Sequence, residues 1–134
     1  MSEEIMYISM KDLKPGRFVM IDGVPCKVVS VDTSAPGKHG AAKMRVTAIG
    51  IFDGSKKTLL KPSDADAEAP VINKLRAQVV SVTENIAQLM DLETYETYEL
   101  PIPEELKHSL KPASEVEILE TMNRKAIMRV VGGA

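Results

Sequence analysis

Turn-forming residues recur at short intervals through the first half of the chain and divide it into short pieces. They are Lys14-Pro15-Gly16, Asp22-Gly23, Pro36-Gly37, His39-Gly40 and Asp53-Gly54. The pieces between them are rich in Val, Ile, Phe and Thr and partly alternate in polarity, which predicts strands over RFVMI, VPCKVVSV, AKMRVTAIGIF and KKTLL. Asp22-Gly23 and Asp53-Gly54 indicate tight hairpins. About five short antiparallel strands in about 70 residues favour a small barrel that closes its own edges.

The second half repeats this pattern with one interruption. Strands are predicted over RAQVVSV, NIAQLMDL, TYEL, VEILETM and KAIMRVV, with a turn at Met122-Asn123-Arg124 between the last two. Between the third and fourth lies PIPEELKHSLKPA, where Pro103 at the first helical position, two acids after it and Pro112 beyond predict a short helix. Five strands with one helix in this place favour a Greek-key barrel of the oligonucleotide-binding (OB) type.

The two halves differ in charge. Residues 5–61 hold ten Lys and Arg against four Asp and Glu, a net charge of +6, whereas residues 62–134 hold seven against thirteen, a net charge of −6. Between them, KPSDADAEAP at residues 61–70 is small, polar and without apolar periodicity. We therefore predict an all-β chain of two domains, 1–69 and 70–134. The basic first half indicates a polyanionic partner, although a solvated surface of mixed charge remains an equal alternative.

Several kinds of chemistry have no residues to support them. Two histidines and one cysteine, Cys26, give no cluster for zinc, so no metal site is predicted. PGKHG lacks the first glycine and the Ser or Thr of a phosphate-binding loop, and G-x-S-x-G is absent. We therefore predict that the protein is not an enzyme. The longest apolar runs fall far short of a bilayer span, and a lone cysteine fits a reducing compartment, so a cytoplasmic monomer without membrane contact is expected.

The segment DTSAPGKHGAAK, residues 32–43, places one lysine at the centre of a loop. Pro36 and Gly37 fit a type II turn over residues 35–38, and Gly40 supplies a second permissive backbone position. Lys38 then emerges directly after the turn with small neighbours. From turn chemistry alone, an exposed and inert hairpin tip is the simpler interpretation. Arg45, Lys56, Lys57 and Lys61 fit either a phosphate-contacting face or strand edges kept soluble by charge.

The run from Thr33 to Lys43, T-S-A-P-G-K-H-G-A-A-K, resembles the modification loop of the translation initiation factor 5A family in its archaeal form, which is related to bacterial elongation factor P. The resemblance extends over nearly the whole chain and implies an SH3-like barrel followed by an OB fold. Pro36, Gly37, His39 and Gly40 match the residues that support the modified lysine. Ala35 and Ala41 depart from the commoner pattern, which has lysine at the first position and histidine or serine at the second.

The resemblance also implies a function that depends on Lys38. In the family, deoxyhypusine synthase uses NAD to transfer an aminobutyl group from spermidine to this lysine, and the product is deoxyhypusine or hypusine. The factor binds the ribosome beside peptidyl-tRNA and relieves stalls at consecutive prolines. Its first domain would contact RNA, and the residues expected to do so are Lys43, Arg45, Lys56 and Lys57. The alternatives are a generic RNA-binding protein of two barrels and, with less support, an enzyme with a Schiff-base lysine.

Overall fold

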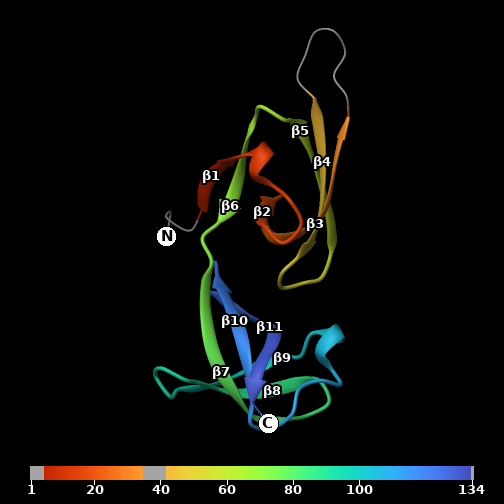
Figure 1. Ribbon diagram of the computed structural model, residues 1–134. Coiled ribbons are helices and arrows are strands. Elements are labelled where there is room, and N and C mark those ends of the chain that lie inside the picture. The colour runs from red at the N-terminus through yellow and green to blue at the C-terminus, as the bar shows by residue number, and fades with distance from the viewer. Residues whose placement is uncertain (1–4, 35–41, 134) are drawn as a thin grey trace. The chain divides into compact units, whose positions relative to one another are not determined.

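The chain forms two compact all-β units, Met1–Val71 and Ile72–Ala134, in the computed structural model (Figure 1). The structure describes residues 5–34 and 42–133. This division lies two residues beyond the boundary drawn from the sequence. The expected fold class, an SH3-like barrel followed by an OB-type barrel, is confirmed.

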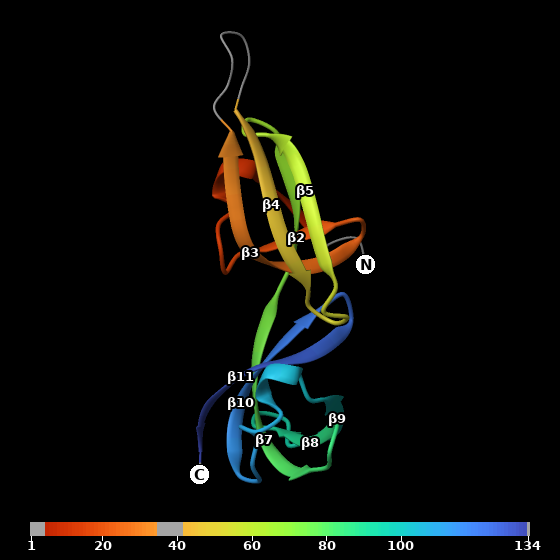
Figure 2. The same ribbon diagram turned by 90° about the vertical axis from the view of Figure 1, so that its right-hand side faces the viewer.

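The first unit is a curled four-stranded sheet facing a two-stranded ribbon. The sheet has the order β2-β3-β4-β5, and the ribbon pairs β1 with β6. The described elements are β1 (Ile5–Ser9), η2 (Met10–Asp12), β2 (Phe18–Ile21), β3 (Val24–Ser34), β4 (Lys43–Gly50), β5 (Lys56–Pro62) and β6 (Asp66–Pro70). Figure 2 shows β3, β4 and β5 as neighbouring strands. The inner face of the four-stranded sheet covers a core that includes Val19 of β2, Cys26 and Val28 of β3, and Val46 of β4.

The acidic segment in which the sequence placed the domain boundary contains a strand of the first unit, β6. Asp66–Pro70 pairs antiparallel with Ile5–Ser9; Ala67 and Ala69 are both buried, and Ala67 belongs to the first core. The segment does alternate, but alanine is its inward-facing residue and acids face out. Because Ala, Asp and Glu all have low β-propensity, the alternation carried no strand signal.

Two of the predicted hairpins differ in outcome. Asp22 and Gly23 both have positive φ, 53° and 75°, and join β2 to β3 directly, as the tight hairpin requires. At Asp53-Gly54 the tight hairpin was wrong, because five residues separate β4 from β5. There Asp53 Oδ1 accepts hydrogen bonds from the backbone N of Ser55 at 3.0 Å and from its hydroxyl at 2.9 Å. The side-chain bonds of Asp53 stabilise a longer loop.

The tetrapeptide VVSV occurs twice, at residues 28–31 and 79–82, and contains a β-bulge each time. In β3, Val28 pairs with Ala48 and Ser30 with Thr47, so Val29 is the extra residue. In the second unit Val79 pairs with Leu89 and Ser81 with Gln88, so Val80 is extra. The two extra valines are 48% and 46% exposed, whereas Val28 and Val79 are each 1% exposed. Each bulge lets two successive residues face outward before the alternation resumes.

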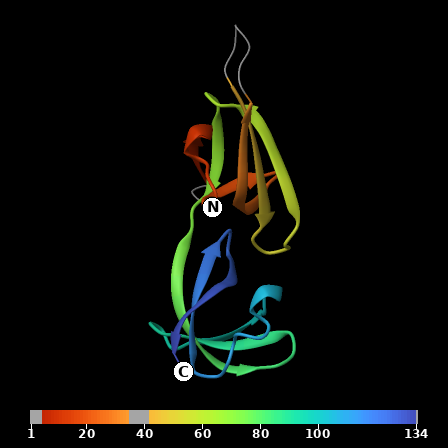
Figure 3. The ribbon, with the colours of Figure 1, turned by 45° about the vertical axis from the view of Figure 1, so that its right-hand side comes forward.

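The second unit is a five-stranded sheet in the order β11-β10-β7-β8-β9. Its strands are β7 (Asn73–Val82), β8 (Ile86–Asp91), β9 (Thr97–Pro101), β10 (Ser114–Thr121) and β11 (Arg124–Gly133). Figure 3 shows β7 in green alongside the blue β10–β11 hairpin. The edge strands β9 and β11 are in contact, which closes the barrel around a second core that includes Val79, Leu89, Val116 and Ile118.

The second unit contains the predicted turn at Met122-Asn123 but not the full predicted helix after Pro103. Met122 and Asn123 both have positive φ, 53° and 62°, and form the predicted turn between β10 and β11. The predicted helix is reduced to one 3-10 turn, η3 (Glu104–Leu106). Pro103 has ψ 148° and precedes that turn rather than opening a helix. A proline-flanked segment this short forms a single turn because few hydrogen bonds offset the cost of nucleation.

Candidate functional site

The predicted modification loop joins β3 to β4. Lys38 and its supporting residues Pro36, Gly37, His39 and Gly40 lie outside the described residues, as does the predicted type II turn. The described part is the stem on which this loop is mounted, because β3 ends at Ser34 and β4 begins at Lys43.

The two ends of the stem are joined by hydrogen bonds. Ser34 and Lys43 are paired across the ladder, and the Ser34 hydroxyl donates to the carbonyl oxygen of Lys43 at 3.3 Å. On the other side, the backbone N of Ser63 donates to the carbonyl oxygen of Ala42 at 2.7 Å. Three consecutive strands thus hold the points where the loop leaves and re-enters the barrel. A loop with fixed ends has less conformational freedom to lose when it binds.

The inner face of the stem is anchored in the first core. Met44 is 5% exposed and Val46 is 0% exposed, and they alternate with Lys43 and Arg45, which are exposed. Val31 pairs with Val46 on the same inner face. Because side chains of a strand alternate between faces, burial of one set fixes the other set on the outside.

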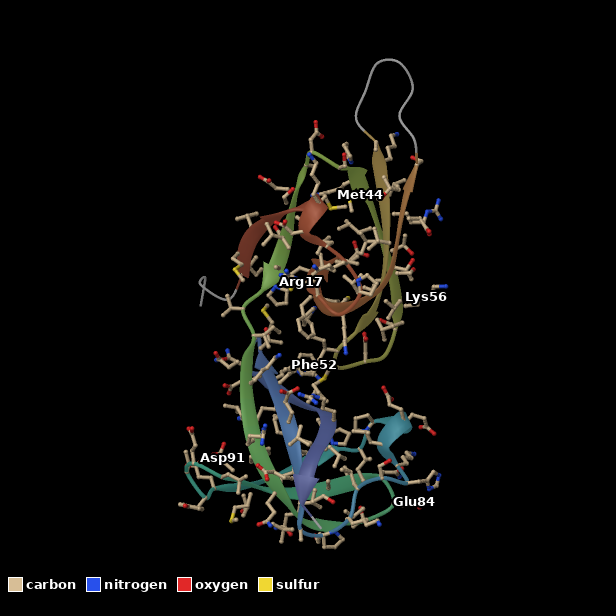
Figure 4. All side chains as sticks on the ribbon, in the orientation of Figure 1. Arg17, Met44, Phe52, Lys56, Glu84 and Asp91 are labelled. Carbon is tan, nitrogen blue, oxygen red and sulfur yellow. The ribbon has the colours of Figure 1, made fainter. Side chains whose placement is uncertain are left out.

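Three of the four predicted RNA-contacting residues share the outer face of the sheet. Paired residues of antiparallel strands lie on one face, and Ile49, on the same face of β4 as Lys43 and Arg45, pairs with Lys56. Figure 4 shows the Lys56 side chain extending away from β5. Lys57 pairs with the buried Ala48 and therefore lies on the opposite face. The four lysine and arginine residues do not form one cluster.

Lys57 lies in a different electrostatic environment, near Asp53 and Cys26. Burial raises the pKa of the Cys26 thiol, and the negative charge of Asp53 raises it further, whereas the positive charge of Lys57 lowers it. Cys26 is 0% exposed, and its thiol donates to the carbonyl oxygen of Val24 at 3.3 Å. Cys26 therefore behaves as a small buried side chain of the first core.

Lys27 also lies on the outer face, although it was not among the residues expected to contact RNA. It pairs with Phe18 of β2 and with Ile49 of β4. Its position was readable from alternation, because Lys27 stands between Cys26 and Val28, two buried residues of the same strand.

The net charges of the two structural units differ less than the net charges of the two halves compared in the sequence. Residues 1–71 hold ten Lys and Arg and nine Asp and Glu, a net charge of +1, and residues 72–134 hold seven and ten, a net charge of −3. The acids at positions 64, 66 and 68 belong to the first unit, and Asp66 and Glu68 lie on the β1–β6 ribbon. The excess of positive charge is thus confined to part of the first unit rather than spread over it.

Ion pairing also differs between the units. The ion pairs found in the described part of the second unit include Arg76–Glu115, Lys107–Glu104, Lys125–Glu120 and Arg129–Glu117. Within the described residues, no Lys or Arg side chain of the first unit forms an ion pair. Residues 5–34 and 42–133 also contain no group of three His, Cys, Asp or Glu placed to hold a metal ion. None of the helices in this part of the chain could span a membrane.

Two family models together match most of the chain. Residues 5–65 match "Translation initiation factor 5A-like, N-terminal". Residues 71–130 match "Eukaryotic elongation factor 5A hypusine, DNA-binding OB fold". The two matches follow the two structural units in order.

Relatives and solved structures agree with these models. Translation initiation factor 5A of Korarchaeum cryptofilum is 51% identical over 127 residues, 93% of this chain and 95% of that protein. The Archaeoglobus fulgidus factor is 48% identical over 123 residues, 92% of this chain and 96% of that protein. The structure titled eukaryotic translation initiation factor 5A from Methanococcus jannaschii superposes with a TM-score of 0.80 at 43% identity and covers 96% of this chain and 98% of that one. The chain therefore belongs to the translation initiation factor 5A family.

Proposed function

We propose that this translation factor acts on the ribosome through a modified Lys38. The observation that supports this most directly is the three-stranded stem, in which Ser34, Lys43 and Ser63 fix both ends of the APGKHG loop. In the proposal, deoxyhypusine synthase transfers an aminobutyl group from spermidine to Lys38 Nζ, with NAD as its cofactor. The side chain gains length and a second amine.

The extended amine would act by positioning rather than by bond chemistry. It reaches the peptidyl transferase centre and holds the acceptor end of peptidyl-tRNA in a productive orientation, which matters most where consecutive prolines react slowly. Positioning alone can supply several kcal/mol of a barrier when the reacting groups are otherwise misaligned. A stem bonded on both sides supports this role, because a loop already held at its ends loses little entropy when it docks.

The test is Lys38→Arg, which keeps the positive charge but cannot accept the aminobutyl group. We expect this variant to fold normally and to lose stimulation of a reporter that contains consecutive prolines, while a reporter without them is unaffected. Lys57→Arg is the matched control, because it makes the same change in the same unit on the inner side of the sheet. Normal poly-proline synthesis by Lys38→Arg would disprove the proposal.

Mass spectrometry of protein from its native host gives an independent test. The peptide containing Lys38 should carry the mass of one aminobutyl group or of its hydroxylated form. Unmodified lysine there would instead favour the alternative, a generic RNA-binding protein. That alternative predicts that Lys38→Ala weakens RNA binding by only about one phosphate contact.

A further inference from the structure

Strand β1 is the outer strand of the β1–β6 ribbon (Figure 1). Within residues 5–34 and 42–133, β1 pairs with β6 alone, so its other edge is open. An open strand edge presents backbone N–H and C=O groups that can pair with another chain. Proteins commonly protect such an edge with lysine or proline, but the sequence of β1, IMYIS, contains neither.

The hydrogen bonds of the ribbon show which backbone groups lie on the open edge. The backbone N of Met10 donates to the carbonyl oxygen of Ala65 at 3.0 Å, one step beyond the last pair of the ladder. Hydrogen-bonded pairs alternate along an antiparallel ladder, so Tyr7, three positions before Met10, directs its N–H and C=O away from β6. On β6, the carbonyl oxygen of Asp66 likewise points away from β1 and accepts from Lys61 Nζ at 2.8 Å. The N–H and C=O of Tyr7 have no partner among the described residues.

The outer face of the ribbon combines an exposed aromatic ring with acids. Tyr7 is 71% exposed and pairs across the ladder with Glu68, which is also exposed. They form a non-hydrogen-bonded pair, the type in which side chains lie closer together. Asp66 is on the same face, and neither β1 nor β6 contains a Lys or Arg. Glu68 forms no ion pair within the described residues, so this face attracts positive charge.

The other face of the open edge is apolar. Met6 and Ile8 lie on the same face as Ala67 and Ala69, the buried alanines of β6. Ile8 packs against the first core, whereas Met6 is 50% exposed. Because side chains alternate along a strand, a strand added to β1 would place apolar residues beside Met6 and Ile8 and the residue between them opposite Tyr7.

We propose that β1 binds an extended basic segment of a partner protein, which adds to the ribbon as an antiparallel strand. A Lys or Arg of that segment lies opposite Tyr7, stacks on its ring and reaches toward Glu68. Alternate apolar side chains of the segment cover Met6 and Ile8. Main-chain hydrogen bonds along the open edge supply affinity, and the alternating side chains supply specificity.

Charge decides between this occupant and the others that an open edge could take. The acids of the ribbon repel nucleic acid. A second copy of the chain, paired through its own β1, would bring no basic residue opposite Tyr7, because IMYIS has none. The contact goes beyond the proposed function, since it uses neither Lys38 nor its modification.

The probe is a fluorescein-labelled peptide of alternating valine and lysine, and anisotropy gives its affinity for the full chain. In the antiparallel pair, the lysine opposite Tyr7 exchanges both backbone hydrogen bonds with it, while the valine N–H groups point to solvent. N-methylation of the lysines should therefore abolish binding, and N-methylation of the valines should leave it unchanged. A peptide of alternating valine and glutamate should not bind. These comparisons use the unaltered protein.

Substitutions on the outer face test the side-chain contacts. Tyr7→Ala and Glu68→Gln should each weaken binding of the valine–lysine peptide about two- to fivefold, and Glu68→Gln should also reduce its dependence on salt. The matched controls in the second unit are Tyr95→Ala and Glu93→Gln, because Tyr95 is 69% exposed and Glu93 is exposed. Both should leave the affinity unchanged. Circular dichroism checks that the variants remain folded.

The proposal is overturned if methylation of the valines weakens binding at least as much as methylation of the lysines, or if the valine–glutamate peptide binds as tightly as the valine–lysine peptide. Equal effects of Tyr7→Ala and Tyr95→Ala would also overturn it. So would equally tight binding of a labelled IMYIS peptide, because a second copy of the chain would then be the occupant. Lys38→Arg should leave peptide binding unchanged, so normal poly-proline synthesis in that variant would reject only the proposed function.

Discussion

The side chain of Tyr98 is well packed, but its buried hydroxyl lacks a hydrogen-bond partner among the described residues. Tyr98 lies on β9, pairs with Leu89 of β8 and packs against the second core. Lys125 Nζ lies 5.3 Å from the centre of its ring, within the range of a cation–π contact. Burial, and then the negative charges of Asp91 and Glu120, raise the pKa of Tyr98 to about 12.

Removing this hydroxyl should not destabilise the protein. We expect Tyr98→Phe to leave the free energy of unfolding unchanged or to raise it by up to about 1 kcal/mol, because a buried hydroxyl without a partner keeps its desolvation cost. Because the folded pKa lies above the unfolded value near 10, wild-type stability should be fully present below about pH 10 and fall as pH rises through about 12. Urea unfolding at several pH values measures both effects.

The control is Tyr95→Phe, because Tyr95 is 69% exposed and the same change there should shift stability by less than about 0.5 kcal/mol. Tyr98→Phe should also lack the alkaline loss that Tyr98 contributes to the wild type. A loss of more than about 1 kcal/mol in Tyr98→Phe at neutral pH would show that the hydroxyl is bonded after all.

At the scale of elements, the bulges in β3 and β7 decide which side chains face the core and which face solvent in the rest of each strand. Without the extra Val29, continued alternation would turn Asp32 and Ser34 toward the core and Val31 toward solvent. The bulge keeps Lys27 and Asp32 on one outer face although an odd number of positions separates them along β3. The same tetrapeptide produces the same irregularity in β7, where Ser81 and Gln88 are hydrogen bonded at 3.2 Å on the outer face.

The burial of β6 can be tested directly, because a charged side chain introduced at a buried position destabilises the unit and one at an exposed position does not. Ala67 is 1% exposed and faces the first core, whereas its neighbour Glu68 is exposed on the other face. We expect Ala67→Asp to destabilise the first unit by roughly 3 kcal/mol or more, since it buries an unpaired carboxylate. Native-state hydrogen exchange of β4 amides measures the change. Glu68→Ala should shift the stability by less than about 0.5 kcal/mol, and equal effects of the two substitutions would contradict the burial of Ala67 in the first core.

At the scale of the whole molecule, the chain has two cores with no residue in common. The first is built from β2, β3, β4, β6 and η2, and the second from β7, β8, β10 and β11 with the segment after β9. The units differ in electrostatics as well, since the described ion pairs named above all lie in the second. Separate cores and separate charge patterns let one unit change without rebuilding the other.

This separation predicts local rather than global responses to core substitutions. Val46→Ala should lower the stability of the first unit by roughly 2 kcal/mol, and Val116→Ala should do the same in the second, because both side chains are 0% exposed. Hydrogen exchange should report each loss only in the strands of the substituted unit. If Val46→Ala raised exchange equally in β7 and β10, the two units would unfold as one cooperative structure.

Much of the local structure could be predicted because it depends on few neighbouring atoms. The turns at Asp22-Gly23 and Asn123 form because Asp, Gly and Asn accept positive φ, which is a property of the residues themselves. The strands with Val and Ile at alternate positions were predictable for the same reason. The stem of the Lys38 loop was also implied by the sequence, since alternating residues flank the glycines on both sides.

The sequence by itself determined the all-β class, the two barrels, the loop with Lys38 at its centre and the family to which the chain belongs. The tertiary structure decided which residues share a face. Ile5 pairs with Pro70, and Lys27 reaches the row of Lys56 only through Ile49, so these relations depend on strands far apart in the chain. Pairing between distant strands is fixed by burial of a common core rather than by local preference, which is why the pairing of β6 with β1 and the alignment of Lys27 with Lys56 became visible only in the folded molecule.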